Sequence, residues 1–324
     1  MKIMIKHITM IITLLLLVSG MIGCNSEESE TGADSIPTQD IKNEIDSEEG
    51  AKQTGDGNMD QVGMVVDKKG EIEFSPMNGN KVSANIPTAI THTSLNTTHE
   101  YILDVYLPDD YDEAVKYPVV YVTDGNWRRE DVDDLKSLYQ DGQIQDVIYV
   151  LICYPDHIDI DYQRFGEFIN EPDIMLDIIV NGIVPYISDS YSVDKENATL
   201  CGASCGGYFL TYSFLQNDQM TKDVFKNYIL ASPTFEYNTY GTTLDDFENE
   251  FASRSEDLKA NIYMSVGALE EADIYIEPFE NLVKKLSERE YQSLNLTTLI
   301  DEGKNHYTVW IPNLIEGLKM YYGR

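Results

Sequence analysis

Basic residues are scarce in this sequence, and that scarcity limits what the protein can bind. Lys and Arg together number 23 against 56 Asp and Glu in 324 residues, which gives a formal net charge of −33. Because phosphate groups are repelled by so acidic a chain, the charge argues against nucleic acid and anionic lipid headgroups as partners. An acidic surface is also compatible with solubility outside the cell, and this is the interpretation that we adopt.

The first 23 residues have a different composition from the rest. Two lysines precede an apolar run at 8–18, and small residues then lead to Cys24, which is the layout of a secretory signal. The segment 19–24 (SGMIGC) resembles a bacterial lipobox, in which the cysteine is lipidated and becomes the mature N-terminus, although Met21 stands where Leu is usual. The alternatives are an uncleaved transmembrane anchor and simple secretion. We therefore expect an extracytoplasmic protein that is anchored to the bacterial cell membrane through lipidated Cys24, after a lipoprotein signal peptide at 1–23.

Large apolar residues are nearly absent from the next segment. Residues 25–62 carry 11 acidic and 2 basic side chains among Ser, Gly, Asn and Gln. Such a segment cannot bury enough apolar surface to offset the entropy lost on ordering. The sequence predicts a disordered acidic tether at 24–62 and a single folded domain at 63–324, in which no repeat with a period of 20 to 50 residues is present.

Cysteine is also rare, with four residues in the whole chain. If Cys24 carries lipid, then Cys153, Cys201 and Cys205 remain, an odd set without the spacing of a disulfide framework or of a zinc site. We therefore expect no structural disulfide, no metal and no cofactor.

The apolar pattern of the folded domain predicts an α/β protein. Runs rich in β-branched and aromatic residues, typical of buried parallel strands, lie at 118–122, 146–153, 198–202, 228–231 and 262–266, and further strands are expected at 100–107 and 293–300. Helical spacing occurs at 173–190, at 208–215 and around 284–286. Strands that alternate with helices predict a mostly parallel sheet covered on both faces, with the chemistry at the carboxyl ends of its strands.

A candidate nucleophile lies between one of these strands and the helix that follows it. The segment 202–206 (GASCG) matches G-x-S-x-G, the turn that projects a serine hydroxyl from the end of a strand. The turn is so tight that Gly202 and Gly206 must lack bulk, and the helix that starts near Cys205 points its free amides at the serine. An ordinary glycine-rich turn is the alternative, but the strand and helix on either side favour Ser204 as the nucleophile.

Histidine is scarce as well, which narrows the choice of a base. A serine hydroxyl needs a histidine to accept its proton. Of the five histidines, only His306 follows Ser204 in the chain, as the order serine, acid, histidine requires. His306 lies in a polar loop, and an exposed histidine without a catalytic role is the alternative.

The third member of a triad is a carboxylate that orients the imidazole. Glu270 follows directly after the predicted strand 262–266 and is our first candidate. Glu271, Asp273 and Glu280 stay open as alternatives, as does a Ser–His dyad without an acid.

Two backbone amides are expected to stabilise the oxyanion that forms during acyl transfer. The first is the amide of Cys205, and the second is the amide of Asn126 in the loop that follows strand 118–122, with Gly125 giving room. The side chains of this loop need not take part, and a redox function of the Cys205 thiol is the less favoured alternative.

From residue 100 onward the sequence resembles an esterase branch of the α/β-hydrolases. This branch includes enterochelin esterase, esterase D, feruloyl esterase domains and the mycolyltransferase antigens. The motifs that carry the resemblance are VYLPDDYD (105–112), YPVVYVTDGNW (117–127), RFGEF (164–168), IVPYI (183–187), LCGASCGGYF (200–209), VGALE (266–270) and GKNHYTVW (303–310). The resemblance implies an α/β-hydrolase fold in which Ser204, His306 and Glu270 are catalytic and the amide of Asn126 belongs to the oxyanion hole. Cys205 departs from the pattern, because a larger or aliphatic residue is expected there.

These features together predict a serine carboxylic ester hydrolase that forms an acyl-enzyme. Its substrate is expected to be a small-molecule or glycan ester outside the cytoplasm, such as a siderophore lactone or an acylated sugar. Two alternatives remain, an acyltransferase of the same fold and a lipoprotein that binds a ligand without turnover. Tyr307, Val309 and Trp310 are expected either to line the acyl pocket or to pack in the core, and an insertion at 234–258 is expected to shape the pocket.

Overall fold

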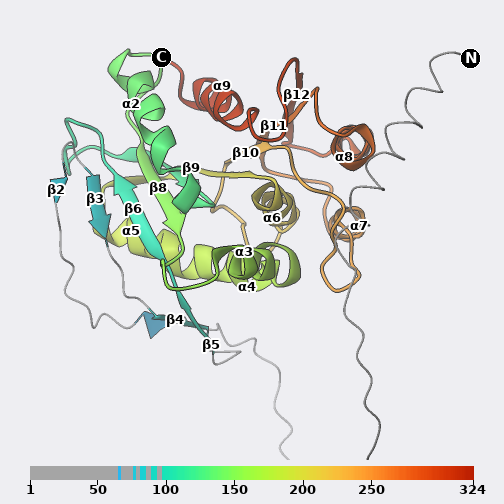
Figure 1. Cartoon of the computed structure of the whole chain (residues 1–324), viewed down its shortest axis with the longest axis horizontal. Coiled ribbons are helices and arrows are strands. Elements are labelled where there is room, and N and C mark those ends of the chain that lie inside the picture. The colour runs from blue at the N-terminus through green and yellow to red at the C-terminus, as the bar shows by residue number, and fades with distance from the viewer. Residues whose placement is uncertain (1–64, 67–75, 78–80, 85–88, 93–96) are drawn as a thin grey trace, which may run out of the picture. The chain divides into compact units, whose positions relative to one another are not determined.

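A computed structural model describes residues 65–66, 76–77, 81–84, 89–92 and 97–324 of the chain (Figure 1). All of these belong to one unit, residues 59–324. The predicted signal peptide, Cys24 and the predicted tether lie outside the described residues, so the structure does not test them.

The main element of the fold is a nine-stranded sheet with the strand order β12-β11-β10-β9-β7-β8-β6-β3-β2. The six strands from β12 to β8 are parallel, and the last three run antiparallel to their neighbours. In chain order the strands are β2 (Pro76–Met77), β3 (Lys81–Ala84), β6 (Ile102–Tyr106), β7 (Tyr117–Val122), β8 (Ile148–Cys153), β9 (Val193–Ala203), β10 (Asn227–Ala231), β11 (Asn261–Gly267) and β12 (Asn295–Asp301). A smaller antiparallel sheet contains β1 (Val65–Val66), β4 (Ala89–His92) and β5 (Thr97–Glu100).

The central strands form where the sequence predicts buried parallel strands. Every residue of β7, β8 and β10 is buried, as expected of strands that helices cover on both faces. β9 begins at Val193 and is longer than predicted. The prediction missed its first half (DKEN) because these residues are polar and partly exposed and do not show the apolar pattern of the second half. The predicted α/β fold is confirmed.

The helices cover the sheet in two layers, with α2 (Val132–Gln140) and α9 (Trp310–Tyr322) on one face (Figure 1). The other face carries the remaining described helices: α3 (Ile160–Phe165), α4 (Pro172–Ile178), α5 (Val184–Ser190), α6 (Cys205–Phe214), α7 (Leu244–Arg254) and α8 (Glu277–Arg289). Neighbouring strand residues point into opposite layers, so Val119 and Tyr121 of β7 belong to one core cluster and Val120 to the other. The layers leave the carboxyl ends of the strands open to the loops.

The predicted helix at 173–190 is a helical run with a π turn, η4 (Ile179–Ile183), between α4 and α5. Pro185, which has no backbone N–H, lies just after this turn, where the ordinary hydrogen-bond register resumes. Similar π turns, η3 (Gly166–Asn170) and η5 (Ala272–Ile276), flank α3 and α8, and two short 3-10 turns, η1 (Gly125–Trp127) and η2 (Arg129–Asp131), follow β7.

Candidate active site

The candidate residues follow the carboxyl ends of four neighbouring parallel strands. Ser204 follows β9, Ser232 follows β10, Glu270 lies three residues after β11, and His306 lies in the loop after β12. Since these strands are adjacent in the sheet, their ends meet at one edge. Residues separated by about a hundred positions in the sequence are thereby brought together.

Ser204 occupies the turn between β9 and α6 in a conformation that is rare for a residue with a side chain. Its φ is 57° and its ψ is −121°. The backbone is fixed from both sides, because the Ser204 amide donates to the carbonyl of Ala231 at 3.0 Å and its carbonyl accepts from the amide of Thr234 at 3.2 Å. The strained turn at the end of a central strand is the geometry of a nucleophile elbow.

The expectation that the elbow lacks bulk is confirmed at Gly206. A Cβ atom at this position would lie 2.7 Å from Oγ1 of Thr123 and 3.2 Å from Oδ2 of Asp124. α6 can therefore start directly beneath the loop after β7. Its first amides, including that of Cys205, have no partners within the helix and favour negative charge at this point.

Glu270 is in direct contact with the imidazole of His306. The Nδ1 atom of His306 lies 2.9 Å from Oε2 of Glu270, whose side chain is fully buried. The other carboxylate oxygen, Oε1, accepts hydrogen bonds from the Ser232 hydroxyl and from the Gly267 amide at 2.7 Å. A carboxylate accepts a hydrogen bond from Nδ1–H, which leaves the Nε2 atom of His306 free to act as a base.

Opposing effects act on the pKa of Glu270. Burial raises it, but the hydrogen bonds from His306, Ser232 and the Gly267 amide lower it by more, so the pKa lies below its usual value. Glu270 is consequently a carboxylate at neutral pH. Ser232 was not predicted from the sequence, since its hydroxyl reaches Glu270 only through the pairing of β10 with β11.

The loop that carries His306 is fixed by backbone and ring contacts. The Leu269 amide donates to the carbonyl of Lys304 at 2.9 Å, which ties this loop to the segment that carries Glu270. The ring of Tyr275 lies 4.6 Å from the imidazole of His306. The alternative acids Glu271, Asp273 and Glu280 are exposed, whereas Glu270 faces the imidazole.

The side chain of Asn126 fixes the loop after β7, a role that the sequence did not predict. Its Nδ2 donates to the carbonyl of Tyr154 at 2.8 Å, and its Oδ1 accepts from the Tyr154 amide at 2.7 Å. The paired bonds are possible because the loop after β7 lies beside the end of β8. Only the backbone amide of Asn126 was assigned a function from the sequence, and the amide side chain is what holds it in place.

An ion pair between Asp124 and Arg164 also lies next to the elbow. The guanidinium donates from Nε at 2.6 Å and from Nη2 at 2.9 Å to the two oxygens of the carboxylate. Sequence reasoning missed this pair because its members are 40 residues apart, although Arg164 begins the RFGEF motif.

Cys205 is buried, and burial is the main reason why the pKa of its thiol is raised. The raised pKa favours the protonated thiol, whereas the thiolate is the reactive form, so the redox alternative is not favoured. Within the part of the chain that the structure describes, Cys153, Cys201 and Cys205 form no disulfide with one another.

Aromatic side chains surround the candidate site. Tyr307 is 89% exposed and lies beside His306 at 5.8 Å, whereas Trp310 is buried in the core. Phe165 and Tyr237 meet edge to face at 5.0 Å, and Trp127 is half exposed beneath the guanidinium of Arg164. Of the three residues considered for an acyl pocket, Trp310 and Val309 are therefore core residues.

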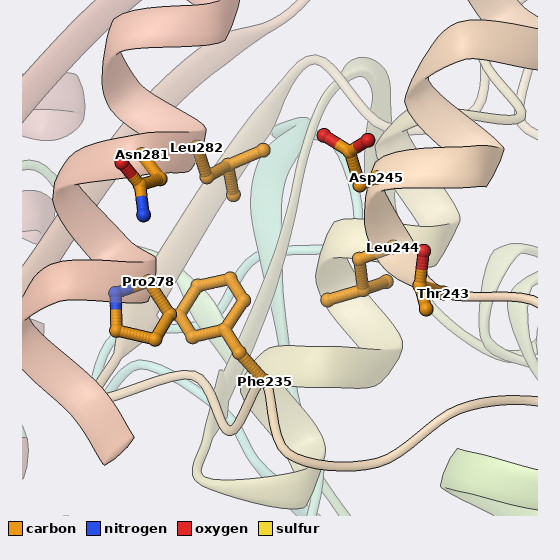
Figure 2. Close-up of a pocket in the computed structure, with 7 residues that line it drawn as sticks. All are labelled: Phe235, Thr243, Leu244, Asp245, Pro278, Asn281 and Leu282. Carbon is orange, nitrogen blue, oxygen red and sulfur yellow. The ribbon is translucent and has the colours of Figure 1, made fainter. Parts of the chain in front are cut away.

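A cavity of about 270 Å³ lies between α7 and α8, within and beside the predicted insertion at 234–258 (Figure 2). Phe235 reaches into it from the loop after β10, one residue beyond the Thr234 amide that donates to Ser204. The side chains that line the cavity are Phe235, Thr243, Leu244, Asp245, Pro278, Asn281 and Leu282. Four of these seven side chains, those of Phe235, Leu244, Pro278 and Leu282, are apolar.

Two further observations concern only the part of the chain that the structure describes. No group of three or more His, Cys, Asp or Glu side chains there could hold a metal ion. Within the same residues, no helix combines the length and the apolar composition needed to cross a bilayer.

Comparison with solved structures supports the fold. The protein BES from Bacillus cereus is 20% identical, with a TM-score of 0.63 over 77% of this chain and 97% of that chain. The siderophore hydrolase EstA from Aspergillus nidulans is 16% identical, with a TM-score of 0.61 over 78% and 98% of the two chains. The enterobactin and salmochelin hydrolase IroE is 16% identical, with a TM-score of 0.55 over 71% and 92%.

No curated protein sequence matches the chain. The family model described as "Putative esterase", in contrast, matches residues 94–321, which is most of the chain and includes every residue of the candidate site. The protein therefore belongs to this esterase family of α/β-hydrolases.

Proposed function

We propose that the protein is a serine carboxylic ester hydrolase with the triad Ser204, His306 and Glu270. The observation that carries the proposal is the contact between the imidazole of His306 and the buried carboxylate of Glu270, together with a strained serine that follows β9 at the same edge of the sheet. Membership of the esterase family supports the same reaction class. The proposal assigns each of the three residues one step of acyl transfer.

In the proposed reaction, Nε2 of His306 takes the proton of the Ser204 hydroxyl while Oγ of Ser204 attacks the carbonyl carbon of the ester. The amides of Cys205 and Asn126 stabilise the negative charge on the tetrahedral intermediate. His306 then donates the proton to the leaving alcohol, which leaves an acyl group on Ser204. Water, activated by the same imidazole, hydrolyses the acyl-enzyme and restores the hydroxyl. Glu270 keeps the imidazole oriented and stabilises its charged form throughout.

The proposed substrate is an ester outside the cytoplasm, either a siderophore lactone or an acylated sugar. Similarity to the siderophore hydrolase EstA and to the enterobactin and salmochelin hydrolase IroE supports the first class. The exposed rings of Trp127 and Tyr307 support both, since aromatic faces bind planar acyl groups and sugars alike. An acyltransferase remains the second candidate, because the same acyl-enzyme can react with an alcohol in place of water.

The triad is tested by labelling with a fluorophosphonate probe and by hydrolysis of p-nitrophenyl acetate. Ser204→Ala is expected to take up no probe and to lose at least about 10³-fold in kcat, because only the oxyanion hole and binding remain. Its melting temperature should match that of the wild type. A wild-type protein that folds and binds a ligand but neither reacts with the probe nor hydrolyses the ester would refute the proposal and favour the binding lipoprotein.

The substrate class is tested with a panel of a trilactone, a feruloylated sugar, an acetylated sugar and simple esters. Hydrolysis of one class at the highest kcat/KM assigns the substrate. Product analysis with an added sugar acceptor separates the two enzyme candidates, since an acyltransferase forms the acylated sugar in preference to the free acid.

We also propose that the enzyme is attached to the bacterial cell membrane by a lipid on Cys24. The support is the signal layout of residues 1–23 and the lipobox-like segment before Cys24. Membrane fractions should contain the wild type with a lipid-modified N-terminus by mass spectrometry, and Cys24→Ala should lack that lipid. An unmodified wild-type N-terminus would contradict the anchor.

A further inference from the structure

The loop that carries the second oxyanion donor, residues 124–126, is held by a closed ring of contacts that passes through side chains and through the backbone of Tyr154. The ring runs from Asp124 to Arg164, along the helix to Glu167, across to Tyr154 and back to Asn126. None of these side chains is assigned a step in the proposed reaction. The ring nevertheless encloses the backbone whose amide must point at the oxyanion.

The first half of the ring ties the loop to the nucleophile. The Arg164 side chain is 16% exposed and that of Asp124 is 1% exposed, and their two parallel hydrogen bonds fix both position and angle. The Nη2 atom of Arg164 also lies 3.4 Å from the carbonyl of Ala203, the residue before Ser204. One guanidinium thus contacts the oxyanion loop and the start of the elbow.

The second half of the ring fixes the helix that carries Arg164. Glu167 is buried and accepts hydrogen bonds from the hydroxyls of Tyr154 at 2.9 Å and Tyr101 at 2.8 Å. Arg164 and Glu167 are three residues apart in a continuous helical run, so they move together. Because the backbone of Tyr154 is bonded to the side chain of Asn126, the ring closes on the loop where it began.

The loop adopts a conformation that needs such support. Asp124 has a φ of 60°, in the left-handed region that a residue with a side chain seldom adopts. Gly125 packs so tightly against β8 that a Cβ atom would lie 2.6 Å from Sγ of Cys153. Strain of this kind persists only where the surrounding contacts determine the backbone fully.

We propose that Arg164 is a positioning residue that, through Asp124, holds the Asn126 amide in place relative to Ser204 before the ester binds. The inference rests on the proposed hydrolase function. An oxyanion hole stabilises the transition state only if its donors need no rearrangement during the reaction. Loss of the Arg164 fork therefore lowers kcat and leaves the binding of the ground-state ester nearly unchanged.

The test uses the full-length protein with the variants Arg164→Lys and Asp124→Asn. For p-nitrophenyl acetate we expect kcat to fall by about 10²-fold while KM changes by less than about threefold, as for loss of an oxyanion donor. The inhibition constant of phenylboronic acid, which forms a tetrahedral adduct with the serine, should rise in parallel with the loss in kcat. The double variant should lose little more than either single variant, because the two residues act as a unit.

Arg254→Lys is the matched control. Arg254 forms the same forked pair with Asp218, at 2.8 and 3.1 Å, and contacts the carbonyl of Leu215 at the opposite end of α6 from Ser204. Its kcat should equal that of the wild type. If Arg164→Lys does not fold, Tyr154→Phe carries the same test, because it removes only the hydroxyl that joins the ring to Glu167.

The possible results separate the inference from the function on which it rests. A folded Arg164→Lys protein with the kcat of the wild type overturns the inference, and so does a change in KM alone, which would assign Arg164 to substrate binding. Both results leave the hydrolase function intact. A wild-type protein without activity on the ester or reaction with a fluorophosphonate refutes the function itself.

Discussion

At the scale of single residues, the candidate site depends on one imidazole whose orientation is set by a buried carboxylate. Glu270 uses both oxygens, one for His306 and one for Ser232 and the Gly267 amide. All three of these groups donate hydrogen bonds to an ionised carboxylate. A neutral amide in place of the Glu270 carboxylate would make the imidazole either rotate or lose its Nδ1 proton. The acid therefore sets the tautomer of His306 rather than taking up the proton.

Glu270→Gln is accordingly expected to lower kcat by about 10⁴-fold with a small change in KM, since the amide favours the wrong tautomer of the base. Steady-state kinetics with p-nitrophenyl acetate measure both constants. Glu271→Gln is the matched control, because Glu271 is adjacent in sequence but exposed, and it should keep the kcat of the wild type. A Glu270→Gln enzyme within tenfold of the wild type would instead indicate a Ser–His dyad.

At the scale of elements, α7 and α8, which both line the cavity of Figure 2, are joined by a buried charge. Glu248 of α7 has no exposed side-chain surface and accepts hydrogen bonds from Arg289 at 2.9 and 3.0 Å and from Tyr291 at 2.6 Å. Lys285 of α8 lies 3.1 Å away. These contacts fix the distance between the two helices that line the cavity.

Removing this carboxylate is expected to destabilise the fold. Glu248→Ala should lower the free energy of unfolding by about 3 kcal/mol, the lower end of the range for a broken buried pair, since Arg289 keeps access to water. Urea unfolding followed by circular dichroism measures the change. Lys284→Gln is the control, because its pair with Glu288 is exposed on both sides, and it should shift stability by less than about 0.5 kcal/mol.

Because of the same contacts, the free energy of unfolding is expected to fall as the solution becomes acidic. Burial raises the pKa of Glu248, but the hydrogen bonds from Arg289, Tyr291 and Lys285 lower it by more, so the folded pKa lies below the ordinary value of 4.5. The unfolded chain then binds more protons than the folded one in acid. The stabilisation is complete above pH 4.5 and is lost as the pH falls through the folded pKa. In Glu248→Gln this part of the acid loss should be absent.

The elements of the site were predictable from the sequence to the extent that their signals are local. The strands that end before Ser204 and Glu270 are continuous apolar runs, and the order of the chain selects His306. The Ser232 hydroxyl and the Arg164 fork were not predictable, because each reaches its partner across 38 to 40 residues through sheet register and helix packing. The polar start of β9 was missed for another reason, since a strand that extends into solvent does not show an apolar pattern.

At the scale of the whole molecule, the negative charge of the chain extends to the candidate site. The chain carries a net charge of −33, and Glu236 and Glu271 are exposed near Tyr275. Burial and the charges of Glu236, Glu270 and Glu271 raise the pKa of Tyr275 to about 12. The negative potential thus extends to the ring that contacts His306. An anionic ester approaches this site against a repulsive field.

This field predicts the response of the enzyme to salt. The test compares three p-nitrophenyl esters of similar acyl length but different charge: the neutral butyrate, the anionic succinate and the cationic 4-(trimethylammonio)butyrate. A difference among them in the response to salt therefore reports the charge of the substrate rather than its shape. Raising NaCl from 10 to 200 mM shortens the Debye length from about 30 Å to less than 10 Å and so screens the field. Over this range we expect kcat/KM to rise by about threefold to tenfold for the succinate ester. The same constant should fall for the cationic ester and stay level for the butyrate. If the succinate were instead the fastest ester at low salt, a local cation would have to dominate the approach, and anionic siderophores would become the favoured substrates over acylated sugars.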